Sequence, residues 1–203
     1  MNRGLSIIEL LLALAITGLV AAGVAAMLGG VASGIAVGTD ARTGMLASGV
    51  IQGRVVEAVA PGACVLASTE TATAIWLGDT TPGGNVEPSE CAWIVFDALQ
   101  GIITIERVVF PDSWSMIERA KFDRPLRPNG DPFPILLEAR NEGIAEADIL
   151  ADSVLAIEFP SGTALLNDTG LRMDLQLELP TGAWAMTATT VFSAYDTPRE
   201  WKP

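Results

Sequence analysis

The amino-terminal apolar segment constrains the fold more than any other feature of the sequence. Between Arg3 and Asp40, the only ionisable side chain is that of Glu9. About 20 helical residues span the hydrocarbon core of a bilayer, so residues 5–25 are long enough to cross it as a helix. A soluble domain within a chain of 203 residues has little room to bury such a rod as a core helix. We therefore predict a single transmembrane helix over residues 5–25.

A cleaved secretory signal peptide is the main alternative. Arg3 precedes the apolar stretch, and Gly23-Val24-Ala25 has the small-x-small pattern of a cleavage site. Two features argue against it. A carboxylate inside an apolar segment, as at Glu9, is costly and normally has a functional partner. The apolar character also continues beyond Ala25 as far as Val37.

The residues around Glu9 resemble a known processing signal. Gly4-Leu5-Ser6-Ile7-Ile8-Glu9-Leu10 closely resembles the class III leader of type IV pilins and type II secretion pseudopilins. In that family a prepilin peptidase cuts after the glycine and methylates the new amino terminus, and the fifth mature residue is glutamate. The resemblance implies a leader peptide of residues 1–4, cleavage between Gly4 and Leu5, methylation of Leu5, and subunit assembly through Glu9. The usual first mature residue is Phe, so Leu5 departs from the family pattern.

Charge pairing explains why a carboxylate at Glu9 would be useful in such an assembly. Cleavage after Gly4 would create an ammonium group at the edge of the apolar segment, and the Glu9 carboxylate would lie one turn further in. Pairing this carboxylate with the amino group of a neighbouring subunit would neutralise both charges. Breaking a buried ion pair by removing one partner costs about 3 to 5 kcal/mol. Our hypothesis is that Glu9 recruits the subunit into a filament.

Glycines interrupt the same segment at a density that needs a reason, because each costs about 1 kcal/mol relative to alanine in an exposed helix. Gly30, Gly34 and Gly38 form two overlapping GxxxG spacings, which are typical of close packing between helices. We interpret them as helix-packing residues. A flexible joint is the alternative that the sequence leaves open.

The remainder of the chain predicts an amphipathic helix followed by strands. From Asp40 the apolar residues recur near helical spacing, and Pro61-Gly62 would end the helix. We therefore predict a helix over residues 5–60, with an amphipathic stem after residue 25, and a β-rich head over residues 61–203. The candidate strands are 73–77, 92–96, 102–110, 153–159, 171–179 and 184–194.

The predicted order of elements extends the resemblance to the head. A helix, a hairpin turning at 99–101, a long loop over 111–134 and then further strands resemble J-type minor pseudopilins and PilW-type minor pilins. The fold class implied is α+β, the pilin fold, in which the C-terminal half of a long hydrophobic helix packs on an antiparallel β-sheet head. Most aromatic residues of the head are predicted to lie in the core because they fall in strands. Trp114 and Phe122, in the long loop, are the candidates for exposed contacts, and a place in the core is the alternative for them.

Cys64 and Cys91 are the only cysteines. In a domain outside the cytoplasm, two cysteines favour a disulfide between them. Two buried reduced thiols are the alternative, because sequence spacing does not establish the geometry of a bridge.

Acidic residues in the long loop are the only candidates for a metal site. Asp123, Asn129 and Asp131 could hold a hard cation such as calcium, which some members of the resembled family bind in head loops. The loop lacks EF-hand spacing, and solvated surface acids are the favoured interpretation. We expect no resident metal and no other cofactor.

The absence of histidine and the negative net charge exclude or disfavour further classes of function. The absence of histidine excludes Ser-His-Asp and Cys-His nucleophilic triads, and we do not expect an enzyme. A net charge of -12 opposes binding to nucleic acid.

The predicted function is that of a minor pilin or pseudopilin that primes or caps the tip of a type IV pilus or type II secretion pseudopilus. The expected partners are other major and minor subunits, the prepilin peptidase, the inner-membrane assembly platform and membrane lipid. The expected location is the bacterial inner membrane, as a single-pass protein with its head in the periplasm, and later the filament or cell surface. The alternative is an anchored or secreted acidic binding module with no filament role.

Overall fold

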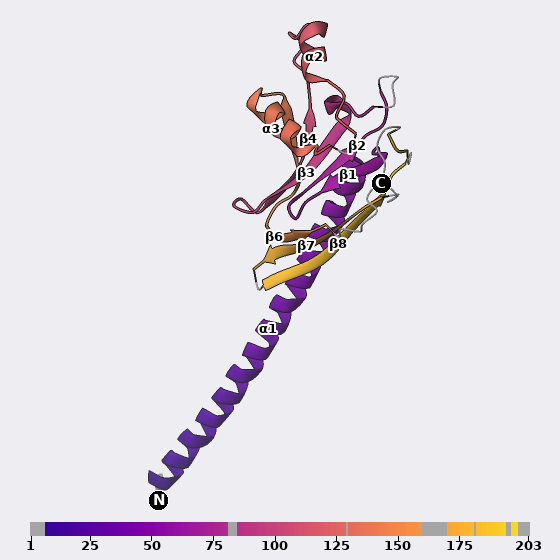
Figure 1. Ribbon diagram of the computed structural model, residues 1–203. Coiled ribbons are helices and arrows are strands. Elements are labelled where there is room, and N and C mark those ends of the chain that lie inside the picture. The colour runs from indigo at the N-terminus through magenta and orange to yellow at the C-terminus, as the bar shows by residue number, and fades with distance from the viewer. Residues whose placement is uncertain are drawn as a thin grey trace, which may run out of the picture. The chain divides into compact units, whose positions relative to one another are not determined.

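The computed structural model describes residues 7–80, 85–128, 130–159, 170–180, 182–193 and 196–198, and the side chains of 9, 10 and 31–40 lie outside this description. The fold class is α+β, with one long amino-terminal helix, α1 (Ile7–Val59), and two antiparallel sheets (Figure 1). The chain divides into two compact units, 1–43 and 44–203. Their boundary lies within α1, whereas the sequence suggested a boundary at 60/61.

The described part of the first unit consists of helix alone. Its stretch Leu11–Gly30 is 20 residues long, is long and apolar enough to cross a membrane, and is not buried anywhere along its length. The sequence placed the crossing at 5–25, and the two ranges overlap over 11–25. The described large apolar residues in it are more than half exposed, including Leu19 at 78% and Met27 at 74%.

A five-stranded antiparallel sheet forms one layer of the second unit. Its strands lie in chain order: β1 (Cys64–Ser68), β2 (Ala72–Trp76), β3 (Cys91–Asp97), β4 (Ile102–Val108) and β5 (Ala145–Ala151). The predicted hairpin joins β3 to β4. The Asp97 carboxylate accepts hydrogen bonds from the backbone N–H groups of Leu99 and Gln100. Gly101 completes the turn with a φ of 65°, a conformation that favours glycine.

A separate three-stranded antiparallel sheet follows in the chain. Its strands are β6 (Val154–Glu158), β7 (Gly170–Leu179) and β8 (Gly182–Val191), in that order across the sheet. The alternation that predicted β7 matches its burial, because Leu171, Met173, Leu175 and Leu177 are buried and the residues between them are exposed or half-buried. The sequence did not show that the strands of the head divide into two sheets.

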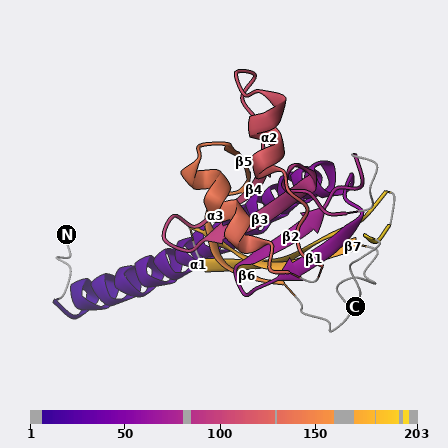
Figure 2. The same ribbon diagram turned by 45° about the horizontal axis from the view of Figure 1, so that its top comes forward.

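Two hydrophobic clusters cover the two faces of the five-stranded sheet. Ile51, Val55 and Val59 of α1 belong to the first cluster, together with buried residues of both sheets. The second cluster contains Trp76 and Trp93, and it is covered by α3 (Phe133–Asn141). In Figure 2 α3 lies across the sheet on the side away from α1.

Two helices lie in or beside the segment expected to be a long loop. They are α2 (Met116–Phe122) and α3. The cap of α2 is visible in the sequence, because Ser115 and Glu118 bond reciprocally to each other's backbone or side chain in a capping box. Trp114 and Phe122, the candidates for exposed aromatic contacts, are both half-buried against Phe110, with ring centroids 5.7 and 6.1 Å from it.

Candidate functional site

The predicted processing and assembly residues lie at the start of the chain. Gly4 and Leu5 fall outside the described residues. Glu9 belongs to the first turns of α1, and its side chain is not part of the description. Glu9 precedes the apolar stretch Leu11–Gly30 by two residues. Its predicted pairing with an amino group therefore stays a prediction.

The predicted packing glycines lie in the same helix. A methyl group added at Gly30 would meet no atom within 4 Å, and the same holds for Gly18, Gly23 and Gly29. These four glycines are thus not required for close approach to any described part of this molecule. Gly34 and Gly38 lie in α1, among the residues whose surroundings are not described.

A small and polar stripe on α1 joins the helix to β8. Gly44, Ser48 and Gln52 are four residues apart and therefore share one face of the helix. The indole of Trp184 lies against Gly44, and its Nε1 donates to Ser48 Oγ at 3.0 Å. A methyl group at Gly44 would lie 2.5 Å from the Trp184 ring. This contact was not predicted from the sequence, although Gly44 and Ser48 have the same small-xxx-small spacing as Gly30, Gly34 and Gly38.

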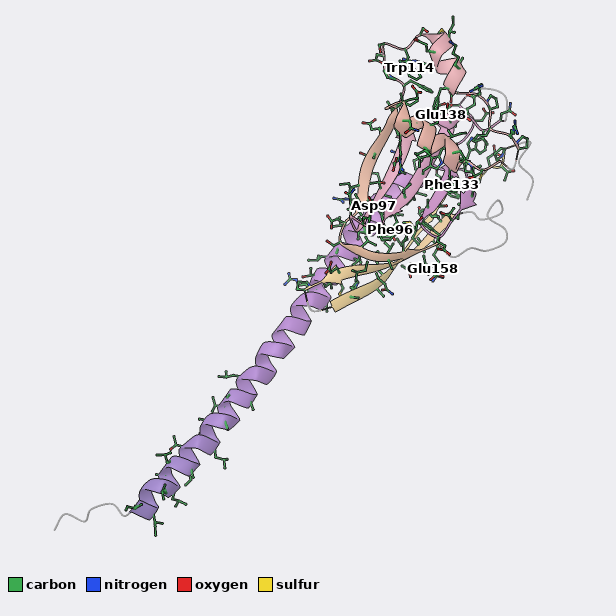
Figure 3. The ribbon with its side chains drawn as sticks, turned by 60° about the vertical axis from the view of Figure 1, so that its left-hand side comes forward. Phe96, Asp97, Trp114, Phe133, Glu138 and Glu158 are labelled. Atoms are coloured by element: carbon green, nitrogen blue, oxygen red, sulfur yellow. The ribbon has the colours of Figure 1, made fainter. Side chains whose placement is uncertain are left out.

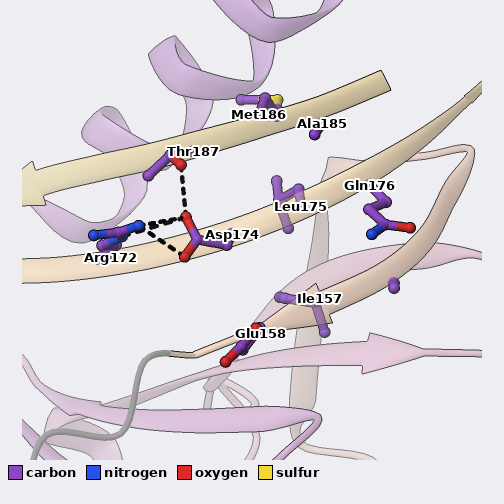
Figure 4. Close-up of a pocket in the computed structure, with 10 residues that line it drawn as sticks. Ile157, Glu158, Arg172, Asp174, Leu175, Gln176, Ala185, Met186 and Thr187 are labelled. Atoms are coloured by element: carbon purple, nitrogen blue, oxygen red, sulfur yellow. Dashed lines mark hydrogen bonds and ion pairs between the residues drawn. The ribbon is translucent and has the colours of Figure 1, made fainter. Parts of the chain in front are cut away.

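A shallow groove of about 480 Å³ lies on the three-stranded sheet (Figure 4). The groove is lined partly by the small side chains of Ala156 and Ala185. Asp174 accepts hydrogen bonds from Arg172 and from Thr187 Oγ1, and these bonds lower the pKa of its carboxyl. Charged, polar and small apolar groups are thus gathered on one exposed strand surface.

The two cysteines do not form the predicted disulfide. Cys64 and Cys91 are both buried free thiols. Trp76 of β2 is the register partner of Cys64 on β1 and of Cys91 on β3, so the two cysteines are two strand spacings apart. That separation is about 10 Å between Cα atoms, beyond the limit of roughly 7 Å for a bridge. The prediction of a bridge is therefore wrong for this fold, and the alternative of two reduced thiols describes it.

Burial also makes these thiols poor nucleophiles. Desolvation, with a smaller effect of Asp196, raises the pKa of Cys64 to about 12. Desolvation, followed by the charges of Glu90 and Asp123, raises the pKa of Cys91 well above its ordinary value. Both side chains are therefore protonated at neutral pH, and the thiolate is the reactive form.

Two carboxylates are buried in the head. Glu90 is 1% exposed and accepts hydrogen bonds from Trp76 Nε1 and from the backbone N–H and hydroxyl of Thr80. Glu106 is 5% exposed and is held by the guanidinium of Arg140 through two hydrogen bonds. The bond to Glu106 raises the pKa of Arg140. Both carboxylates thus have structural hydrogen-bond partners.

The loop acids proposed for calcium serve separate elements. Asp123 accepts hydrogen bonds from the backbone and hydroxyl of Ser89. Asp131 accepts one from the backbone N–H of Phe133 at the start of α3. Asn129 lies outside the described residues. Among the described residues, no group of three or more acidic, cysteine or histidine side chains is placed to hold a metal ion.

Comparison with known proteins does not assign a function to these residues. No protein-family model, curated protein or solved structure matches the chain. The function must therefore be inferred from the amino-terminal motif, the apolar helix and the surfaces of the second unit.

Proposed function

We propose that this chain is a minor subunit of a type IV pilus or a type II secretion pseudopilus. In this proposal a prepilin peptidase removes residues 1–4 and methylates Leu5, and the apolar part of α1 first anchors the protein in the inner membrane. The same helix then packs with the helices of other subunits, while the second unit remains outside the cytoplasm as the head. Its role is to prime or cap the filament tip.

The two kinds of surface on α1 carry the proposal. Large apolar side chains are exposed throughout Leu11–Gly30, and a surface of this kind requires lipid or other helices around it. Later in the same helix, Ile51, Val55 and Val59 are buried among residues of both sheets. One helix can thus serve as a membrane anchor or filament stem and also as part of a head core.

The glycine spacing and Glu9 support the filament role over a simple anchor. A plain anchor needs neither a carboxylate within its apolar segment nor repeated GxxxG spacing. Because a methyl group at Gly30 would meet no atom within 4 Å, no described side chain accounts for its small size, and the GxxxG spacing fits packing against a neighbouring helix.

Amino-terminal sequencing of the membrane fraction tests this function. The proposal expects mature protein that begins at methylated Leu5, and it expects Gly4→Glu to remain uncut while still inserting into the membrane. A mature chain that begins near Ala26 would identify a secretory signal peptide. An uncut Met1 would identify a plain anchor, and either result would favour the acidic binding module.

A further inference from the structure

Helix α2 presents two large apolar side chains to solvent. Met116 is 87% exposed and Ile117 is 72% exposed. Both lie in the first turn of α2, at the end of the second unit remote from the three-stranded sheet (Figures 1 and 3). Large apolar side chains that are adjacent and almost fully exposed mark an interaction surface more often than isolated ones do.

The surface on α2 is held firmly in place. The Ser115 and Glu118 capping box fixes the first turn, with Ser115 Oγ 2.7 Å from a Glu118 carboxylate oxygen. Phe110, Trp114 and Phe122 form an aromatic cluster at its base. Arg119 donates to the Pro111 carbonyl at 3.0 Å. A preordered surface loses little conformational entropy when a partner binds.

Cations accompany these apolar residues in a chain that is otherwise strongly acidic. Lys121 and Arg124 are exposed, and neither belongs to an ion pair among the described residues. Glu118 bonds to Ser115 and Asp123 bonds to Ser89. Lys121 also attracts the Glu118 carboxylate, and the exposed Asp112 lies in the turn before α2. We call the exposed residues Met116, Ile117, Lys121 and Arg124, on α2 and just after its C-cap, the α2 tip. Apolar and cationic groups of this kind suit a recess with small side chains beside a carboxylate.

The groove on the three-stranded sheet offers small side chains and the carboxylate of Glu158, and its other two charged residues, Arg172 and Asp174, pair with each other. The Ala156 and Ala185 side chains that line it are exposed and leave room for larger apolar groups. Glu158, at the same groove, is exposed and belongs to no ion pair within the described part of the chain. Figure 3 shows Glu158 far from Trp114 at the base of α2, so the tip of one molecule does not reach its own groove.

We propose that the α2 tip of one copy docks into the groove on the three-stranded sheet of a second copy. Met116 and Ile117 contact Ala156 and Ala185 in this contact, and Lys121 and Arg124 lie beside Glu158. The contact joins different surfaces of the two copies, so it is heterologous and can repeat.

Complementary single-surface variants test this docking in the full-length protein in detergent micelles. The tip variant is K121E/R124E, and the groove variant is E158K, all at exposed positions. Sedimentation velocity of the wild type should show concentration-dependent association with a Kd on the order of 100 µM, as expected for a small interface. Either variant alone should lose this association. An equimolar mixture should regain association, because the intact tip of one variant meets the intact groove of the other, and the charge-reversed tip and charge-reversed groove also attract each other.

Two further measurements distinguish this docking from association through the apolar helices and from membrane binding. The variant M116Q/I117Q should also remain monomeric while keeping the circular dichroism spectrum and thermal unfolding of the wild type. For the wild type, raising NaCl from 0.05 to 0.5 M should weaken association about tenfold. Association of both charge variants at the wild-type level would assign self-association to the apolar helices and overturn the proposal. The proposal would also be overturned if the mixture of the two variants stayed monomeric. It would equally be overturned if the wild-type protein bound anionic vesicles through the tip but did not self-associate. The proposal does not rest on the filament function, because it requires no cleavage after Gly4.

Discussion

The side-chain amide of Gln52 on α1 bonds both backbone groups of Thr189 on β8. Its Nε2 donates to the Thr189 carbonyl at 2.5 Å, and its Oε1 accepts from the Thr189 N–H at 3.0 Å. Because β8 is the last strand of its sheet, this helix side chain supplies the hydrogen bonds that a neighbouring strand would otherwise provide. The contact joins the helix to the three-stranded sheet by polar bonds in addition to the apolar core.

We predict that Gln52→Ala lowers the free energy of unfolding of the head by about 1 to 2 kcal/mol. The substitution leaves the Thr189 N–H and carbonyl to water, which replaces the lost bonds only in part. Urea unfolding followed by circular dichroism measures the change. The control is Gln100→Ala at the exposed β3–β4 turn, which should change stability by less than about 0.5 kcal/mol. Equal effects of the two variants would show that the Gln52 bonds add nothing.

Two glycines of α1 should respond oppositely to alanine. At Gly44 the new methyl group would lie 2.5 Å from the Trp184 ring, which is held by its bond to Ser48, so we expect a loss of about 1 to 3 kcal/mol. At Gly49 nothing lies within 4 Å, and alanine should stabilise the helix by up to about 1 kcal/mol. Thermal unfolding of the two variants gives the signs, and a stabilising Gly44→Ala would contradict the described contact between Gly44 and Trp184.

Periodic patterns predicted much of the fold, whereas contacts between distant segments could not be predicted. The alternation in 171–179 identified β7 because each apolar residue faces the core. The edge strand β5 was missed because Glu146 and Asp148 alternate with small residues, and four of its seven residues are exposed. Strand β1 was missed although β2 is equally short, because β1 follows directly on the helix terminator Pro61-Gly62.

The candidate site shows the same division. The apolar span was evident because it depends on composition and length alone. The prediction of a disulfide was wrong because a bridge depends on how many strands separate Cys64 from Cys91. The sequence does not give the order of strands in the sheet, which places β2 between them. The importance of Gly44 depends on Trp184, which lies 140 residues later in the chain and contacts it only through the fold.

Removal of Arg140 should lower the free energy of unfolding, because it leaves the buried Glu106 carboxylate without its ion-pair partner. We expect Arg140→Ala to lose about 2 to 3 kcal/mol, less than for a fully buried pair because the Arg140 side chain is 43% exposed. Arg172→Ala is the matched control, since its pair with Asp174 is more exposed and should be worth no more than about 1 kcal/mol. Adding Glu106→Gln to Arg140→Ala should recover part of the loss in urea unfolding. No recovery would indicate that the arginine acts through packing alone.

The buried thiols should make the head less stable at alkaline pH. The folded pKa of Cys64 is raised from 9.0 to about 12, so the folded protein keeps this proton while the unfolded chain releases it above about pH 9. Stability is thus fully present below pH 9 and falls as the pH rises toward 12, by up to about 1.4 kcal/mol per pH unit for each thiol. Urea unfolding at pH 7, 9 and 10.5 measures the slope, and Cys64→Ala should reduce it. An unchanged slope in that variant would contradict a role for the Cys64 thiol.

Replacement of Glu9 tests the assembly role directly. We expect Glu9→Leu to insert into the membrane normally, because a more apolar segment crosses a bilayer at least as well. It should nevertheless be lost from sheared filaments, since the amino group of a neighbouring subunit would have no carboxylate partner. Glu57→Leu is the matched control, because Glu57 is exposed on the same helix and far along it from the amino terminus. Quantitative immunoblotting of the filament and membrane fractions gives the ratio for each variant. Incorporation of Glu9→Leu at the level of Glu57→Leu would remove the charge-pairing hypothesis.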